Sequence, residues 1–195
     1  MALTERKTDA VAAALELFWS KGYVETSMAE LVTATGMNRY ALYSVFGNKR
    51  EIFLAALETY FEEGRQTFEP LLGNTEMPPL ARIEAGMRIF IEKLSEKPNG
   101  CFICHVAAEH RSDDPEVDKA VNDYFTKIRD VMRIPLAEAA AAGDLNPNLT
   151  PDCAAQLVFD AKMSLGVHAR AGAPSTDLEK IIRATLAALR AYKPA

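Results

Sequence analysis

The sequence predicts an all-α protein of about nine helices, with a short three-helix group at its start and longer helices after it. Apolar residues recur at the three- and four-residue spacing of a helix face in nearly every segment. Glycine or proline, often next to a capping residue, separates these segments. No segment alternates apolar and polar residues for long enough to suggest a β-sheet. We therefore expect a helical group over residues 1–50 and a helical body over residues 51–195.

The composition is that of a globular protein that folds without cross-links. The 195 residues are 49% apolar and 25% charged, which is enough to bury a core without metals or disulfides. The three cysteines are an odd number and argue against a disulfide framework. We find no signal peptide and no run as long as a transmembrane helix, so we expect a cytoplasmic protein with no membrane partner. We also expect no cofactor.

Three helices are predicted in the first 50 residues. The first covers residues 5–21, with apolar residues on one face. Ser27 and Glu30 have the spacing of a capping box and open the second helix. Asn38 is a good N-cap for the third helix. Each of the three segments is followed by a glycine that suits the closing position of a helix, namely Gly22, Gly36 and Gly47.

The later helices begin at capping residues or prolines. Asn48 with Glu51 opens the fourth helix. Helix starts with an early proline are predicted at three further places, namely Pro78–Pro79, Asp114–Pro115 and Thr150–Pro151. Pro135 should kink or interrupt the helix that starts near residue 114. Thr176 and Glu179 have the spacing of a capping box and should open the last helix.

The two short helices on either side of Gly36 form a candidate helix-turn-helix. The second helix of this motif lies in the major groove of DNA, with its first residues against the base edges. Arginine is a good reader of guanine, and asparagine of adenine. The residues that we expect to contact bases are Asn38, Arg39 and Tyr40. The alternative is a helical hairpin with no role in DNA binding.

The net charge of −5 is unusual for a DNA-binding protein. Residues 1–50 hold six of the 22 basic residues but only five of the 27 acidic residues, so the acidic excess lies in residues 51–195. The sequence therefore has no broad basic patch, and DNA binding must depend on a few well-placed groups. The backbone amides at the helix starts near Ser27 and Asn48 are natural binding sites for phosphate.

The first quarter of the chain matches the pattern F-x-x-x-G-Y-x-x-T-S-M-x-x-L…G…L-Y-x-x-F-x-x-K. The matching residues are Phe18, Gly22, Tyr23, Thr26, Ser27, Met28, Leu31, Gly36, Leu42, Tyr43, Phe46 and Lys49. In this string the chain resembles the tetracycline-repressor (TetR) family of bacterial regulators. The resemblance implies a DNA-binding head of three helices, a linking fourth helix, and a body that binds an effector and dimerises. By position, it implies phosphate contacts from Thr26, Ser27, Tyr43 and Lys49.

One residue departs from that family pattern. Many members have histidine at the position of Val45, so the phosphate contact that this histidine implies is missing here. The function implied is a ligand-responsive transcriptional regulator, usually a repressor that a small molecule releases from double-stranded operator DNA. Activators also occur in the family.

We expect a largely apolar effector, held by aromatic and methionine side chains of the central helices and by a few polar ones. The candidate residues are Phe61, Met87, Phe90, Phe125, Phe159, Met163, Cys104, His105 and Arg129. The alternative for each apolar residue is an ordinary place in the core.

The eighth predicted helix is apolar on two faces, whereas a helix at the surface of a monomer needs only one. One face holds Leu157, Val158, Ala161 and Leu165, and the other holds Ala155, Phe159 and Met163. The ninth helix also has a broad apolar stripe. These two helices predict a homodimer. The alternative is that both faces pack within one subunit.

Cys101, Cys104 and His105 form a C-x-x-C-H sequence and share one face of a short helix predicted over residues 100–110. We exclude the c-type haem that this motif attaches, because attachment requires export. Three interpretations remain: buried apolar cysteines, a thiol sensor of oxidants or electrophiles, or a metal site.

The enzyme class has one weak candidate in the sequence. A thiol oxidoreductase built on Cys101 and Cys104 would lack the βαβ setting that such motifs normally have, so we expect the protein not to be an enzyme. A helical protein-interaction module is the further alternative, and it would not bind DNA.

Overall fold

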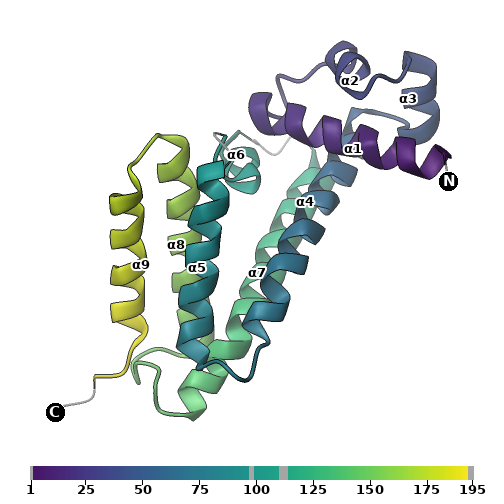
Figure 1. Ribbon diagram of the computed structural model, residues 1–195. Coiled ribbons are helices and arrows are strands. Elements are labelled where there is room, and N and C mark those ends of the chain that lie inside the picture. The colour runs from purple at the N-terminus through teal and green to yellow at the C-terminus, as the bar shows by residue number, and fades with distance from the viewer. Residues whose placement is uncertain (1, 97–98, 110–113, 193–195) are drawn as a thin grey trace. The chain divides into compact units, whose positions relative to one another are not determined.

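The protein is all-helical in the residues that the computed structural model describes, which are 2–96, 99–109 and 114–192. Within these residues, nine α-helices follow one another, and the only β pairing is an isolated bridge between Leu145 and Arg190. The helices in Figure 1 are α1 (Ala2–Lys21), α2 (Met28–Thr35), α3 (Arg39–Phe46), α4 (Lys49–Leu72), α5 (Pro79–Glu96), α6 (Phe102–Glu109), α7 (Pro115–Ala141), α8 (Pro151–Arg170) and α9 (Ser175–Leu189). This confirms the predicted fold class. None of the described helices combines the length and the apolar character that crossing a membrane requires.

The chain divides into two compact units. The first consists of Met1–Gly64 with Phe102–Asn122, and the second of Arg65–Cys101 with Asp123–Ala195. Both α4 and α7 therefore contribute residues to each unit. The described residues of α6 and the first turns of α7 belong to the same unit as α1, α2 and α3. The functional boundary expected after residue 50 remains a prediction.

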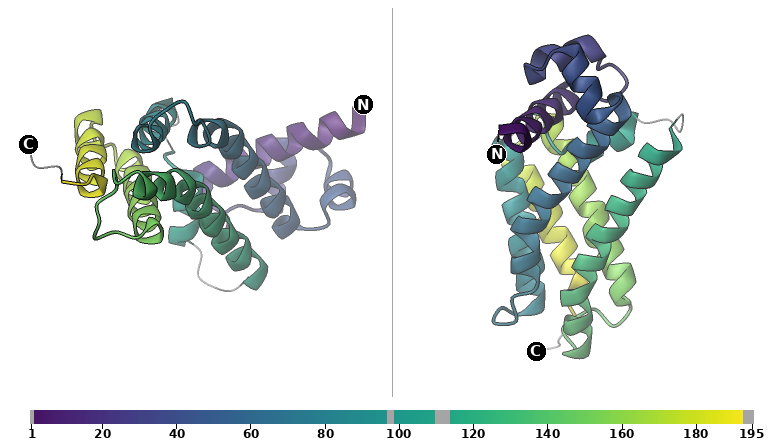
Figure 2. Two further views of the ribbon diagram at one scale, coloured as in Figure 1. Left: turned by 90° about the horizontal axis from the view of Figure 1, so that it is seen from below. Right: turned by 90° about the vertical axis from the view of Figure 1, so that its right-hand side faces the viewer.

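In the first unit, α1 packs against α2 and α2 against α3, and the three helices stay grouped in both views of Figure 2. Phe18 and Leu42 are fully buried in their core. α6 completes this core, because the buried ring of Phe102 lies 5.9 Å from the ring of Trp19 and 5.4 Å from that of Tyr60, measured between centroids. Burial of each such side chain contributes about 1.5–3 kcal/mol.

In the second unit, α5, α8 and α9 lie side by side (Figure 1). One apolar residue from each helix illustrates the shared core: Ile83, Leu165 and Ile182 are all at most 2% exposed. The apolar stripes predicted for the fifth, eighth and ninth helices therefore face one another within the chain.

A buried arginine ties three helices of the second unit together. Arg82 on α5 is 1% exposed and donates a 2.9 Å hydrogen bond to the carbonyl oxygen of Leu72, in the last turn of α4. Its guanidinium also forms an ion pair with Glu138 on α7. A buried charge is costly unless it is paired and hydrogen-bonded, so these two contacts explain why an arginine is stable in this position.

Of the kink or interruption expected at Pro135, the interruption does not occur, because α7 is continuous from Pro115 to Ala141, and the kink remains a prediction. A proline inside a helix removes one backbone hydrogen bond and costs about 3 kcal/mol. Leu136 and Ala139, in the following turn, are fully buried, so packing of this turn offsets the local cost. A second internal proline, Pro70, lies two residues before the end of α4.

The capping box predicted at Thr176 is wrong, because α9 begins at Ser175 and its N-cap residue is Pro174. Pro174 has extended backbone angles and provides no side-chain cap. Glu179 instead accepts a 2.8 Å hydrogen bond from Arg88 on α5. The Glu179 carboxylate therefore bonds to a residue distant in sequence and does not cap its own helix.

Both apolar stripes predicted on α8 are used inside the chain. Their buried members are Ala155, Val158, Phe159, Ala161 and Leu165, while Leu157 and Met163 are half-buried. Packing within one subunit therefore accounts for the width of the apolar surface, which by itself does not require a partner. The homodimer remains a prediction.

Candidate nucleic-acid interface

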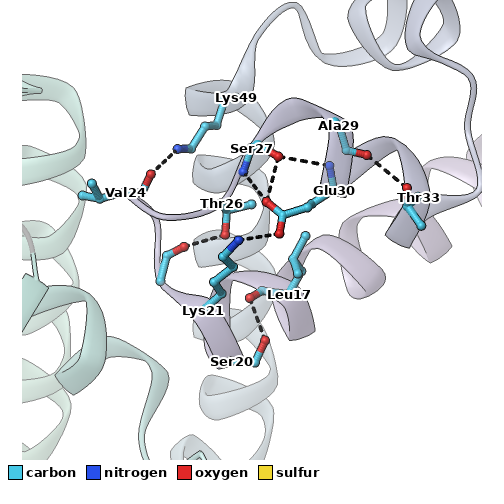
Figure 3. Close-up of polar contacts among 11 residues, drawn as sticks. Leu17, Ser20, Lys21, Val24, Thr26, Ser27, Ala29, Glu30, Thr33 and Lys49 are labelled. Atoms are coloured by element: carbon cyan, nitrogen blue, oxygen red, sulfur yellow. Dashed lines mark hydrogen bonds and ion pairs between the residues drawn. The ribbon is translucent and has the colours of Figure 1, made fainter.

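The helix-turn-helix expected around Gly36 is formed by α2 and α3. Ser27 accepts a 3.3 Å hydrogen bond from the backbone N–H of Glu30, and the backbone N–H of Ser27 donates to the Glu30 carboxylate at 2.9 Å (Figure 3). This confirms the predicted capping box. Gly36 closes α2 with φ +64°, a left-handed conformation that glycine adopts without steric cost.

The carboxylate of Glu30 also joins α2 to α1. It forms an ion pair with Lys21 at the end of α1, and Figure 3 shows both side chains beside Ser27. Hydrogen bonds from Lys21 and then from Ser27 lower the pKa of Glu30 to about 2. This pair was not predicted from the sequence, because Lys21 and Glu30 are in different helices and the capping box explains only the contact of Glu30 with Ser27.

The start of α3 presents polar side chains to solvent. The side-chain oxygen of Asn38 accepts a 2.8 Å hydrogen bond from Ala41 N–H, so Asn38 is the N-cap as predicted. Arg39 is exposed, and Tyr40 is 85% exposed although tyrosine is normally half-buried or more. Tyr43, one turn later, is 39% exposed, and its ring centroid lies 5.7 Å from the Arg39 guanidinium carbon.

Two of the predicted phosphate contacts are engaged within the protein. Thr26 is 1% exposed, and its hydroxyl donates a 2.6 Å hydrogen bond to the carbonyl oxygen of Gly22 (Figure 3). In this conformation the Thr26 hydroxyl holds the turn between α1 and α2, and the phosphate contact expected of Thr26 remains a prediction. Lys49 is half-buried and donates to the carbonyl oxygen of Val24 at 3.1 Å.

The predicted effector residues do not all lie in one unit. Phe61, Cys104 and His105 belong to the first unit, whereas Met87, Phe90, Phe125, Arg129, Phe159 and Met163 belong to the second. In the second unit the ring of Phe159 contacts the ring of Phe125, with centroids 5.2 Å apart, and the Arg129 guanidinium lies over the same ring at 5.2 Å.

A residue missed by the sequence analysis makes a similar contact in the same unit. Lys162 on α8 is 7% exposed, and its ammonium lies 4.3 Å from the centroid of the Phe90 ring. The sequence feature that could have identified Lys162 is its position in a helix that has apolar residues on two faces. The second unit therefore combines aromatic rings with two cations that lie over them.

The surface hollow formed by described residues of the second unit has a volume of about 350 Å³. It is lined by Pro78, Pro79, Leu80, Ala81, Glu84, Asp144, Arg190 and Ala191. None of the predicted effector residues is among them, so the effector site remains a prediction.

The cysteines agree best with the first of their three interpretations. Cys101 and Cys104 are 1% and 6% exposed, whereas Cys153 is exposed. Burial of a thiol among apolar groups makes it less reactive. In the part of the chain that the structure describes, no three His, Cys, Asp or Glu residues are grouped so that they could hold a metal ion.

Two families of known domains match the chain. Residues 10–56 match the family described as "Bacterial regulatory proteins, tetR family", and residues 79–185 match "Tetracyclin repressor-like, C-terminal domain". The chain is 29% identical to the uncharacterized HTH-type transcriptional regulator YezE of Bacillus subtilis over 182 residues, which are 90% of this chain and 92% of YezE. It is 25% identical to the HTH-type transcriptional repressor ComR of Escherichia coli over 179 residues, covering 89% of this chain and 83% of ComR.

A solved structure shows the same fold. It is the TetR family transcriptional regulator CifR, as a triple cysteine mutant complexed with a 26-base-pair double-strand operator DNA. The TM-score is 0.84, at 22% identity, over 93% of this chain and 95% of that chain.

Proposed function

Because the chain belongs to the TetR family of bacterial regulatory proteins, it is a DNA-binding transcriptional regulator, and we propose that it is a repressor that a small effector releases from its operator. Membership of this family sets the chain among regulators and not among enzymes. The relative ComR is a transcriptional repressor, and its 25% identity extends over 89% of this chain. That likeness supports repression as the direction of regulation.

The exposed start of α3 carries the proposal. Arg39 and Tyr40 extend into solvent at the point where a recognition helix meets base edges. The side-chain oxygen of Asn38 is used for capping, which leaves its amide N–H₂ as the group for base contact. Tyr43 and Ser27 are exposed as phosphate contacts need to be. These five residues form the proposed reading surface.

The proposed homodimer uses the outer faces of α8 and α9. Val167, in the last turn of α8, is 56% exposed, which is unusual for valine. Three alanines of α9, namely Ala184, Ala187 and Ala188, are exposed and leave room for the close approach of another helix. A second copy of the chain would cover both surfaces, and two heads would read half-sites about 34 Å apart.

The aromatic group of the second unit supports a particular kind of effector. The buried rings of Phe90 and Phe159 supply apolar surface, and Lys162 and Arg129 lie over them as cations. A ligand that is largely apolar and carries a negative charge would match both properties. We propose this class of effector.

The proposal can be tested by the binding of the full chain to duplex DNA from the region upstream of its own gene. Fluorescence anisotropy would be measured with an excess of unlabelled mixed-sequence DNA. Arg39→Ala should lower the preference for the upstream duplex by about tenfold or more, because a guanine contact is worth about 1–3 kcal/mol. Arg133→Ala removes an arginine of 54% exposure from α7 and should leave the preference unchanged.

Two outcomes would overturn the proposal. If the wild-type chain prefers no part of the upstream region, it does not act there, and if Arg39→Ala keeps the full preference, the reading surface is wrong. Regulation is tested with a reporter gene behind the same region. Deletion of the gene for this protein should raise expression of the reporter, whereas a fall would mean activation.

A further inference from the structure

Two carboxylates at the start of α7, those of its N-cap residue Asp114 and of Glu116 in its first turn, lie beside an arginine at the start of α4. In the first unit, the Nε of Arg50 lies 3.2 Å from an oxygen of Glu116, and its Nη1 lies 3.7 Å from an oxygen of Asp114. Glu51, the next residue along α4, is 3.6 Å from the same Nε. One guanidinium is therefore surrounded by three carboxylates, and two of these come from a helix more than 60 residues further along the chain.

Local structure holds the Asp114 carboxylate in place. Its Oδ1 accepts a 3.3 Å hydrogen bond from the backbone N–H of Glu116, and its carbonyl oxygen accepts one from Asp118 N–H at 3.1 Å. Asp114 thus caps α7, and its side chain is 20% exposed against 35% for Arg50. The Nε–H of Arg50 forms no hydrogen bond within the described residues, so its contact with Glu116 is an electrostatic attraction without hydrogen-bond alignment.

The same cluster lies near the turn between α1 and α2. This turn ends at Ser27 of the reading surface and is contacted by the start of α4. Lys49 precedes Arg50, and its ammonium holds the carbonyl oxygen of Val24. The ring of Tyr23 lies 4.7 Å from that of Phe53 on α4, between centroids. Burial, and then the negative charge of Asp114, raise the pKa of Tyr23, which places Asp114 close to the turn. The first turn of α4 therefore contacts the α1–α2 turn through Lys49 and the start of α7 through Arg50.

We propose that Arg50, Asp114 and Glu116 are positioning residues for DNA binding, which hold the first turn of α4 so that Lys49 and the α1–α2 turn keep the geometry that phosphates require. The inference rests on the proposed function, and it extends the DNA-binding head to α7, more than 60 residues beyond residue 50. None of the three residues is assigned a contact with DNA. They act through Lys49 and the turn that it holds.

The direction in which DNA affinity changes when both carboxylates are removed distinguishes a positioning role from direct contact with DNA. Removal of two negative charges from a protein that binds a polyanion should tighten binding on electrostatic grounds. If Arg50 were a phosphate contact restrained by the carboxylates, their removal would also free it and tighten binding. Only the loss of a required geometry makes binding weaker.

The experiment measures binding of the full chain to a labelled mixed-sequence duplex of about 30 base pairs at low salt, where phosphate contacts dominate affinity. Asp114→Asn with Glu116→Gln removes both charges, and asparagine caps a helix as well as aspartate does, so α7 still begins at residue 115. We expect affinity to fall about fivefold, which corresponds to about 1 kcal/mol. The matched control is Asp130→Asn, which removes an exposed carboxylate from the same helix and should bind no more weakly than the wild type.

A charge exchange provides a second test. Arg50→Glu alone should weaken binding by about tenfold, and Arg50→Glu with Glu116→Arg should recover most of that loss, because the attraction is restored with reversed partners. Direct contact of Arg50 with phosphate predicts no recovery beyond the gain in affinity that Glu116→Arg gives on its own, since that substitution adds two positive charges. In a Lys49→Met background, the effect of the two carboxylate substitutions should shrink, because the group through which they act is gone.

Each outcome has one reading. If the wild-type chain binds neither this duplex nor upstream DNA, the proposed function fails. If the wild type binds and the double carboxylate variant binds equally or more tightly, the positioning role is overturned and the proposed function stands. Circular dichroism and thermal denaturation of every variant should show the wild-type helix content, and Glu116→Gln alone, at a residue 61% exposed, provides a variant that leaves the core intact.

Discussion

The ammonium group of Lys49 donates a hydrogen bond to the carbonyl oxygen of Val24 at 3.1 Å and so joins the start of α4 to the turn between α1 and α2. The same nitrogen lies 4.6 Å from the centroid of the Tyr23 ring. Burial lowers the pKa of Lys49, which reflects the water that the ammonium has lost. A lysine held in this way is ordered before DNA binds, so less side-chain entropy is lost on binding.

We predict that Lys49→Met lowers affinity for mixed-sequence DNA about fivefold and reduces the slope of log affinity against log salt by about 0.9, the value for one phosphate. The substitution keeps an unbranched apolar stem but removes the charge and the hydrogen bond to Val24. Fluorescence anisotropy at several salt concentrations measures both quantities. Lys93→Met, which removes a lysine from α5, should leave the slope unchanged, and an unchanged slope for Lys49→Met would contradict the phosphate contact.

We predict that the stabilisation from Glu30 disappears in acid. Its pKa in the folded protein is about 2, below the ordinary value of 4.5, so its contribution is complete above pH 4.5 and is lost as the pH falls toward 2. Thermal denaturation of Glu30→Gln and of the wild type should give a Tm difference at pH 6 that narrows through this window. Glu25→Gln, an exposed carboxylate of the same turn, is the control. A Tm difference that stays constant with pH would refute the assignment.

Two glycines with left-handed angles should respond differently to alanine. Gly36 has φ +64° and nothing within 4 Å of an added Cβ, so Gly36→Ala should cost about 1 kcal/mol in unfolding free energy, from backbone strain alone. Gly100 has φ +69°, and its added Cβ would lie 2.9 Å from the Cβ of Arg170 and 3.0 Å from the carbonyl oxygen of Gly166. Gly100→Ala should therefore cost about 3 kcal/mol or more. Urea denaturation measures the unfolding free energy of both variants. Equal losses would mean that α8 shifts easily to make room for the added Cβ at residue 100.

The buried Arg82 should be far more sensitive to substitution than an exposed arginine of the same helix. Arg82→Met leaves the carbonyl oxygen of Leu72 without its hydrogen bond and Glu138 without its partner, and we expect a loss of about 2 kcal/mol. The loss is moderate because Glu138 is 40% exposed and can be hydrated. Arg88→Met, at an arginine 44% exposed, should cost at most about 0.5 kcal/mol. Equal effects in urea denaturation would show that Arg82 is not needed to hold α4 and α7.

A dimer through α8 and α9 predicts that Val167→Glu gives a monomer. A charge placed in an apolar interface is desolvated without a partner, which is costly enough to dissociate two subunits. Ile134→Glu on α7 is a matched control, because Ile134 and Val167 are both 56% exposed. Sedimentation velocity should show a dimer for the wild type and the control. A dimer that persists in Val167→Glu would place the interface elsewhere.

Local rules predicted much of this fold. The helix caps at Ser27, Asn38 and Gly36 depend on residues within one turn, so they could be predicted from adjacent residues in the sequence. The helix starts at Pro115 and Pro151 follow the same logic. Each of these features has its full physical cause within four residues of the chain.

The mistaken and missing features depend on contacts distant in sequence. An interruption at Pro135 is prevented by packing of the turn that follows it, and Glu179 bonds to Arg88 on α5 and does not cap its own helix. The cluster around Arg50 involves residues more than 60 positions apart, which no local spacing rule can bring together.

The aromatic contact between Trp19 and Phe102 gives the protein a built-in optical signal. Trp19 is the only tryptophan of the chain, and its ring is 6% exposed between those of Tyr60 and Phe102. Its emission should therefore be blue-shifted at rest and should move to longer wavelength whenever α6 separates from α1. Any separation of α6 from α1 can thus be followed on the unlabelled protein by its own fluorescence.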